Sequence, residues 1–301
     1  MLIRSLALAL VVCLAIAAQD WQTAAGGRMR FDVAGIKPST AFKPPNFPLD
    51  PGDAKTAGGR MSVVFPLITY VAFAYKLMPD EISKPLPKSF PTNASFEIEA
   101  RAPGNPTKDQ MRLMMQSLLA ERFKLKVHFE TQQGSVLALT LVRPGHTGSK
   151  LHPHAEGPQC PEAFEMAPPG SFPNPKDVFP PVCGTTPMWG TKDRTLIGGR
   201  DVTMEVIAGA IHNYGSLATE IDRSVVDQTG LKGRYDFTLE LPPGAIHLVT
   251  VVASISNGAL PDVPETPFTN ALRDQLGLKL VSTKGPIRKL VIDHVEPLSG
   301  N

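Results

Sequence analysis

The chain has 301 residues, of which 42% are hydrophobic and 19% charged, a balance typical of globular proteins and unlike that of disordered ones. Its formal net charge of +2 excludes the strongly basic footprint of a dedicated nucleic-acid-binding protein. Thirty prolines exclude a mostly helical bundle and predict long irregular loops, and aromatic residues at 7% argue against a stacking platform for sugars or bases.

The first 18 residues have the pattern of a secretory signal peptide. Arg4 supplies the positive charge, an apolar run follows, and the small residues at its end favour cleavage near Ala17 or Ala18. The alternative is a membrane anchor, but the run from Ser5 to Ala18 is shorter than the about 20 residues that a bilayer requires. No later stretch reaches that length, so the sequence predicts a secreted or periplasmic protein with no membrane span after cleavage.

Residues 19–142 predict a first unit of alternating strands and helices. A leading strand is expected at Phe31–Lys37, and a short helix is expected behind Pro66, where apolar residues recur at helical spacing. An alternating strand follows at Phe96–Ala100, with carboxylates on one face and apolar side chains on the other.

A longer helix follows in the same unit. Thr107 and Gln110 have the spacing of a capping box, and Met111, Met114 and Met115 recur behind them at helical spacing. An adaptable methionine-rich binding surface is one interpretation of these side chains. At this spacing we predict instead that they belong to the hydrophobic core.

Residues 143–193 predict a connector, because they contain eleven prolines and little periodicity. They also contain Cys160 and Cys183, the two cysteines that remain after the leader. An even number of cysteines in an exported chain predicts a structural disulfide, which contributes about 3 kcal/mol by chain entropy; two free thiols are the alternative. His152 and His154 lie nearby without the spacing of a zinc motif, so no metal site is predicted.

Residues 194–301 predict a second unit with the same order of elements. A helix is expected behind Thr203 and an alternating strand at Tyr235–Leu239. A second helix is expected from Thr266, a capping residue followed by proline, to Gly277.

Each unit is expected to end in a two-stranded hairpin. The predicted turn is Gln133–Gly134 in the first unit and Lys284–Pro286 in the second. The strands that flank these turns are Phe123–Val127 and Val136–Val142, then Leu276–Leu280 and Ile287–Val295.

The recurrence of elements suggests a tandem duplication. The sequence Gly-Gly-Arg at residues 58–60 recurs at residues 198–200, and similar elements follow each copy in the same order. The sequence therefore predicts an α+β fold of two related units, each a small, mostly antiparallel sheet with two helices, joined by the Pro-rich segment.

The sequence contains no motif that assigns catalysis, such as a Gly-x-Ser-x-Gly elbow, a Ser-x-x-Lys or a His-Glu-x-x-His. Asp293 and His294 are neighbours on a predicted strand, so their side chains point to opposite faces and are not expected to pair. Arg234 is an anion contact beside Asp227 in one interpretation and part of a structural Arg–carboxylate pair in the other, which we favour. His128 is expected to be isolated. We predict no catalytic, cofactor-binding or metal-binding residues.

Seven stretches, in order along nearly all of the mature chain, carry a resemblance to a known family. They are Phe31–Ser39, Gly58–Ser62, Gln110–Gln116, Leu118–Leu125, Val226–Phe237, Leu276–Leu280 and Ser282–Pro286. Together they resemble a soil-associated bacterial protein family, abundant in Acidobacteria-type genomes, that has no assigned function. This chain departs from that family at Ser83–Lys88, where relatives carry a Gly-Gly-Pro-x-Trp turn. The resemblance implies a secreted or periplasmic domain, and its attachment to sensor peptidases in some relatives implies sensing or binding.

Two functions remain as hypotheses. The favoured one is a non-catalytic binding, interaction or sensing module that needs no cofactor and takes an extracytoplasmic protein or peptide as its partner. The alternative is an extracellular hydrolase that acts on a polymer or peptide. A paired acid and base in a cleft would favour the hydrolase, whereas a groove along a strand edge would favour the binding module.

Overall fold

The computed structural model describes residues 20–41, 43–56, 58–78, 81–157, 159–160, 179–190, 193–243, 245–246 and 266–298. The predicted leader, residues 1–18, lies outside the described residues, as does the middle of the predicted connector, residues 161–178. None of the helices in the described ranges has both the length and the apolar character needed to traverse a bilayer.

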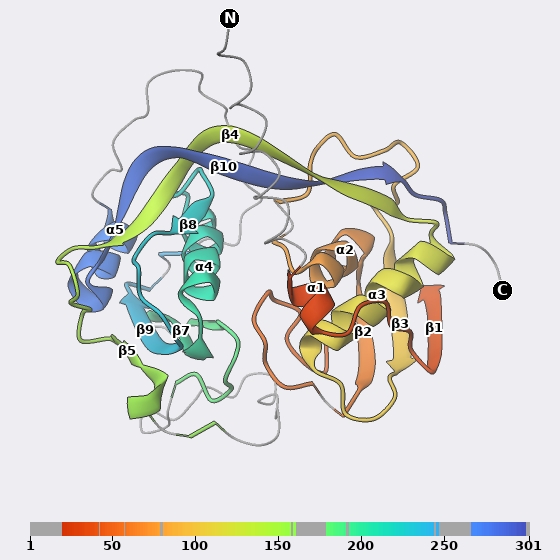
Figure 1. Cartoon of the computed structure of the whole chain (residues 1–301), viewed down its shortest axis with the longest axis horizontal. Coiled ribbons are helices and arrows are strands. Elements are labelled where there is room, and N and C mark those ends of the chain that lie inside the picture. The colour runs from red at the N-terminus through yellow and green to blue at the C-terminus, as the bar shows by residue number, and fades with distance from the viewer. Residues whose placement is uncertain are drawn as a thin grey trace, which may run out of the picture.

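The N-terminal half is a three-stranded antiparallel sheet of order β1-β3-β2 with two helices packed on one face (Figure 1). Its elements are the short helix α1 (Asp20–Ala24), β1 (Val33–Pro38), β2 (Arg60–Pro66), α2 (Leu67–Tyr75), β3 (Ser95–Arg101) and α3 (Lys108–Arg122). The alternation in β3 buries Phe96 and Ile98 against the helices. The three methionines of α3 are buried in the same core, which confirms their predicted role in packing.

The C-terminal half is a four-stranded sheet of order β5-β9-β7-β6. Its elements are β5 (Leu151–Pro153), the 3₁₀ turn η2 (His154–Glu156), β6 (Met188–Gly190), β7 (Thr195–Val202), α4 (Met204–Leu217), β9 (Tyr235–Leu241), α5 (Pro267–Ala271) and the π turn η3 (Leu272–Leu276). Thr203 and Thr266 cap α4 and α5, and Gly277 ends the last turn with a φ of 67°. Strands β5 and β6 come from residues 143–193 and complete this sheet on both sides.

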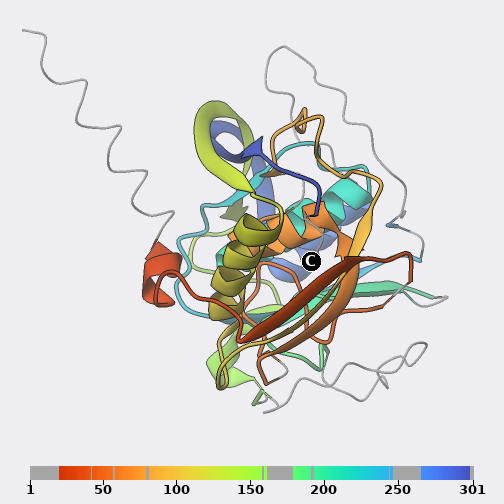
Figure 2. The same ribbon diagram turned by 90° about the vertical axis from the view of Figure 1, so that its right-hand side faces the viewer.

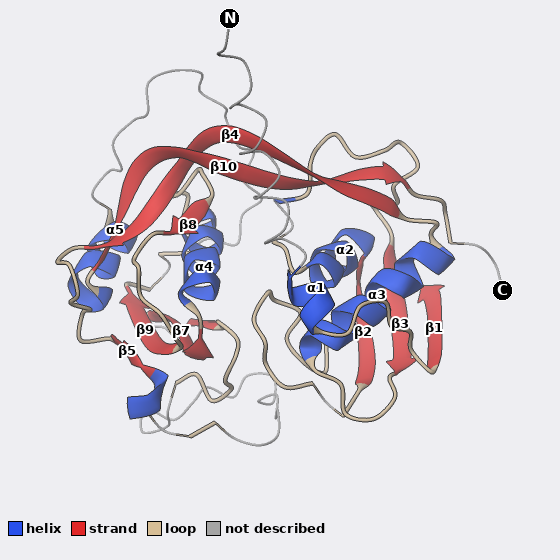
Figure 3. Cartoon of the chain, in the orientation of Figure 1, coloured by secondary structure: helices blue, strands red, loops and turns tan. Residues whose placement is uncertain are grey.

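A long two-stranded ribbon runs across both halves (Figures 1 and 3). It consists of β4 (Lys126–Leu141) and β10 (Leu278–His294), which pair antiparallel along their length, and β8 (Val225–Asp227) adds to β4 in parallel. The two predicted turns are therefore wrong, because Gly134 and Gly285 lie opposite one another in the middle of continuous strands. A Cβ at Gly134 would lie 2.3 Å from the Ile287 side chain, so glycine there allows close cross-strand packing.

The ribbon exchanges strands between the halves. The end of β10 contributes Leu290 and Ile292 to the core of the N-terminal half. The end of β4 contributes Leu137 and Leu139 to the core of the C-terminal half. Each half is therefore completed by a strand that belongs, in sequence order, to the other half, and the two halves share one structural support.

The α+β class is confirmed, and both halves follow the order strand, helix, strand, helix, long strand, except that β8 is added between α4 and β9 in the C-terminal half. The Gly-Gly-Arg sequences do not occupy equivalent places. Arg60 begins β2, whereas Arg200 lies two residues before the end of β7. The tandem duplication therefore remains a prediction that rests on the order of elements.

The capping box of α3 gives a first testable prediction. Thr107 Oγ1 accepts a hydrogen bond from Gln110 N–H at 3.2 Å, and Gln110 Oε1 accepts one from Thr107 N–H at 2.9 Å. Replacing Thr107 with alanine is expected to lower the free energy of unfolding by about 1 kcal/mol, measured by urea denaturation. The exposed turn variant Thr92→Ala serves as control, and equal stability of the two variants would contradict a capping role.

Candidate functional site

Among the described strands, β1 is at the edge of the N-terminal sheet; Figure 2 views the molecule from this side. Ser39 N–H donates to Ser95 O at 2.9 Å, which fixes the phase of the hydrogen bonds between β1 and β3. In an antiparallel ladder every second residue bonds to its neighbour strand. It follows that Ala34 and Ile36 direct their N–H and C=O groups away from β3, toward the outside of the sheet.

A pocket of about 320 Å³ lies between this edge and α3. Its lining combines apolar side chains with exposed charges of both signs. The residues are Arg30, Phe31, Asp32 and Ala34 from the strand side and Met114, Ser117, Leu118, Glu121 and Arg122 from the helix. Arg30 and Glu121 approach to 3.2 Å across the pocket. A strand edge beside a helix-lined pocket is the arrangement in which folded domains add an extended peptide to a sheet.

A cluster of buried charges lies where α3 begins. Lys108 Nζ donates to Asp50 Oδ1 at 2.7 Å, and the side chains of Lys108 and Arg112 are both 0% exposed. Burial lowers the pKa of Lys108 to about 8. Burial alone would raise the pKa of Asp50, but Lys108 and a hydrogen bond from Thr185 hold that pKa below its ordinary value.

The same cluster joins the two halves of the molecule. Thr185, from the C-terminal half, donates its hydroxyl to Asp50, and Ala54 N–H donates to Gly184 O at 2.9 Å. Arg234 makes two hydrogen bonds of 2.8 Å to Asp53. Each charged side chain named here has an oppositely charged partner, so the cluster stabilises the contact between the halves.

Arg234 forms an Arg–carboxylate pair, which agrees with the favoured structural interpretation, but its partners are Asp53 and Asp201. Asp227 instead accepts hydrogen bonds from Thr229. Sequence reasoning missed the buried cluster because its loop residues belong to no motif. A signal was present in α3, where the charged Arg112 stands next to Met111 on the apolar side of the helix, a place that indicates a buried charge with partners elsewhere in the chain.

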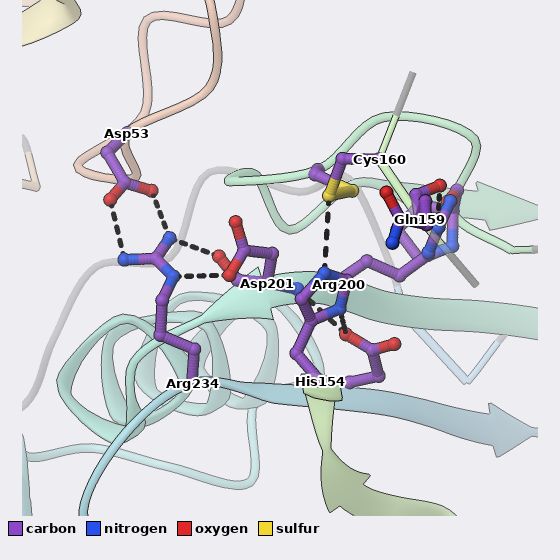
Figure 4. The surroundings of a disulfide bond; sticks show 10 residues. Asp53, His154, Gln159, Cys160, Arg200, Asp201 and Arg234 are labelled. Atoms are coloured by element: carbon purple, nitrogen blue, oxygen red, sulfur yellow. Dashed lines mark hydrogen bonds and ion pairs between the residues drawn. A yellow bond between two sulfur atoms is a disulfide. The ribbon is translucent and has the colours of Figure 1, made fainter. Parts of the chain in front are cut away.

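A third group of polar side chains, after the pocket and the buried charges, comprises His154, Asp201 and Asp236. It lies beside the disulfide between Cys160 and Cys183, a bond that confirms the sequence prediction (Figure 4). His154 Nδ1 lies 2.7 Å from Asp236 Oδ1, and His154 Nε2 lies 3.5 Å from Cys160 Sγ. The buried Asp236 also accepts the N–H of Asp201 at 2.8 Å.

This third group has the composition of a metal site. Ligand atoms of His154, Cys160 and Asp201 all lie within 4.8 Å of one another. The sulfur of Cys160 is bonded to Cys183, however, and a disulfide sulfur does not supply the thiolate that zinc prefers. In the oxidised protein the group is therefore a histidine–carboxylate pair directed at a disulfide.

His128 is not isolated, contrary to the prediction. Its Nδ1 lies 2.8 Å from Asp293 Oδ1, and its Nε2 lies 3.2 Å from Glu130 Oε1. These hydrogen bonds, the one with Asp293 first, raise the pKa of the exposed His128. The pairing of β4 with β10 brings His128 and Asp293 together, and no pattern of neighbouring residues in the sequence predicts this contact. Asp293 and His294 do not bond to each other; His294 pairs with Glu296 at 3.0 Å.

The model of a family described as "Protein of unknown function (DUF3738)" matches residues 68–295. The matched range includes α3, both cysteines and the His154–Asp236 pair, whereas β1 precedes it. No curated protein and no solved structure matches the chain.

Proposed function

The chain belongs to the DUF3738 family of proteins of unknown function, and we propose that it is a non-catalytic binding module that takes up an extended peptide along β1. The observation that carries this proposal is the position of the outward N–H and C=O groups of Ala34 and Ile36 directly beside the pocket on α3.

An added strand would hydrogen-bond to Ala34 and Ile36 through its main chain. Every second side chain of that strand would point to the helix-covered side of the sheet and enter the pocket beside Leu118. Met114 and Leu118 in the lining favour an apolar stem on that side chain, and the mostly polar remainder of the lining favours a polar end. Arg30 and Glu121 offer both charges at the surface, so the peptide's flanking residues are expected to be polar.

The partner is expected outside the cytoplasm. The leader pattern of residues 1–18 supports export, and the Cys160–Cys183 bond agrees with an oxidising compartment. We therefore propose a secreted or periplasmic location and an extracytoplasmic protein or peptide partner. The soil-bacterial origin implied by the resemblance stays a prediction.

The His154–Asp236 pair is the observation that favours the alternative, an extracellular hydrolase, because an oriented imidazole is a common general base. Its second nitrogen, however, faces a disulfide sulfur. A hydrolase of the nucleophilic type needs a hydroxyl or thiol at that place. The geometry therefore supports binding over hydrolysis.

The binding proposal is tested by filling the pocket. Panning a displayed library of random dodecapeptides on the protein is expected to enrich peptides with long side chains at alternate positions, apolar along the stem and polar at the tip. Replacing Ala34 with tryptophan fills the pocket and is expected to weaken their binding at least tenfold, measured by isothermal titration calorimetry. The matched control is Val33→Trp, because Val33 is 69% exposed on the opposite face of the same strand.

Hydrogen exchange supplies the second measurement. Bound peptide is expected to slow exchange of the Ala34 and Ile36 amides, which point away from β3, their neighbour among the described strands. Enriched peptides that bind Ala34→Trp and Val33→Trp equally well would contradict docking at β1. Pairing of β1 with a second copy would appear instead as a dimer in sedimentation, and Ala34→Trp would dissociate it.

A further inference from the structure

Beyond peptide binding, we propose that the Cys160–Cys183 disulfide is a redox-active site that exchanges with dithiols, and that Cys160 is the sulfur that leaves as a thiolate. The site lies in the C-terminal half, apart from β1. It comprises the disulfide, the His154–Asp236 pair and Arg200 (Figure 4).

The first argument is the direction of the imidazole. His154 Nδ1 is held at 2.7 Å by Asp236, a side chain whose residue is only 5% exposed. A proton on Nδ1 shared with this carboxylate leaves the lone pair of Nε2 facing Cys160 Sγ at 3.5 Å. When the disulfide opens, Nε2 is placed to take a proton and to stabilise a thiolate on Cys160 as an imidazolium–thiolate pair.

The second argument is that both cysteine segments are fixed to β7 by one residue. The Arg200 guanidinium donates to Gln159 O at 3.0 Å and to Pro180 O at 3.3 Å. The carbonyl of Arg200 accepts the N–H of Gly184, which follows Cys183, at 2.8 Å. None of these hydrogen bonds depends on the S–S bond. The reduced thiols are therefore expected to stay close together.

The exchange consumes two electrons from a dithiol. One thiolate of the dithiol attacks Cys183 Sγ, the S–S bond breaks, and Cys160 leaves as a thiolate while His154 takes up a proton. The second thiol of the dithiol, as its thiolate, then attacks the first sulfur of the dithiol, which is bonded to Cys183 in the mixed disulfide. That bond breaks, and Cys183 leaves and is protonated. The protein gains two electrons and two protons, one on His154 and one on Cys183, and the dithiol becomes a disulfide.

The test uses dithiothreitol as the dithiol. In the full chain at pH 7, His154→Gln is expected to slow reduction of the Cys160–Cys183 bond at least tenfold. It is also expected to shift the equilibrium with dithiothreitol tenfold toward the Cys160–Cys183 disulfide, which lowers the protein's reduction potential by about 30 mV. The matched control is His152→Gln, which makes the same replacement at an exposed histidine of β5 and is expected to behave as the wild type.

A second measurement separates thiolate stabilisation from a merely structural role and needs no variant. After reduction, Cys160 and Cys183 compete for iodoacetamide, and peptide masses report each site. Cys160 is expected to react nearly as fast at pH 6 as at pH 8. The reaction of Cys183 is expected to slow with each unit by which the pH falls, as that of an ordinary thiol does. The same steep pH dependence at both cysteines, or equal reduction rates for His154→Gln and His152→Gln, would overturn the proposal.

Discussion

Replacing Arg112 with methionine is expected to lower the free energy of unfolding by about 3–5 kcal/mol, the range found when one partner of a buried ionic group is removed. The Arg112 side chain is fully buried and donates to Asp50 O at 2.9 Å and to Gly52 O at 2.6 Å. It also pairs with Asp109 on its own helix. Methionine fills the volume but leaves two carbonyls without their donor, and Asp109 keeps only its pair with Lys76.

Urea denaturation measures this loss, with Arg101→Met as the control because Arg101 is exposed at the end of β3. The control is expected to change stability by less than about 0.5 kcal/mol. A similarly small change for Arg112→Met would show that the loop at residues 50–54 does not depend on this arginine.

Lys108 is expected to give the protein a pH dependence at alkaline pH. Its pKa is about 8 in the folded protein, because burial disfavours the ammonium, and 10.5 in the unfolded chain. Between these values the unfolded chain binds more protons than the folded one, so the free energy of unfolding is expected to rise with pH. The full rise attributable to Lys108 is about 3 kcal/mol.

The measurement compares the free energy of unfolding of the wild type and of Lys108→Met at pH 7, 8, 9 and 10. The wild type is expected to gain stability relative to the variant across this range, since methionine has no proton to lose. Lys126→Met, which removes an exposed lysine from β4, is expected to follow the wild-type profile. Parallel profiles for wild type and Lys108→Met would contradict a lowered pKa at Lys108.

Local chemistry made much of the fold predictable from the sequence. The helix of residues 108–122 follows from a capping box and apolar spacing, and β3 follows from strict alternation between carboxylate and apolar side chains. The Cys160–Cys183 bond follows from the two cysteines that remain when the predicted leader, which contains Cys13, is set aside. The helix and the strand are each predicted by a pattern within a few residues. The disulfide is predicted because two cysteines can pair in one way only.

The candidate sites were less predictable, because their residues meet only in the folded chain. His154 and Asp236 are 82 residues apart, and Asp53 and Arg234 are 181 residues apart. No spacing rule connects residues at such distances. The pocket beside β1 likewise depends on how α3 packs across the sheet, and the sequence shows only that both elements exist.

The sequence by itself determined the α+β class, the helix caps and the core methionines, since each depends on hydrogen bonds or periodicity among near neighbours. It also determined the cysteine pair, because two cysteines can form one disulfide in one way only. Only the tertiary structure decided which strands pair. Glycines 134 and 285 resemble turn residues in sequence but lie face to face inside the ribbon of β4 and β10. The reason is that a hairpin and an exchanged strand satisfy the same local hydrogen bonds, so the choice between them rests on packing of the two cores.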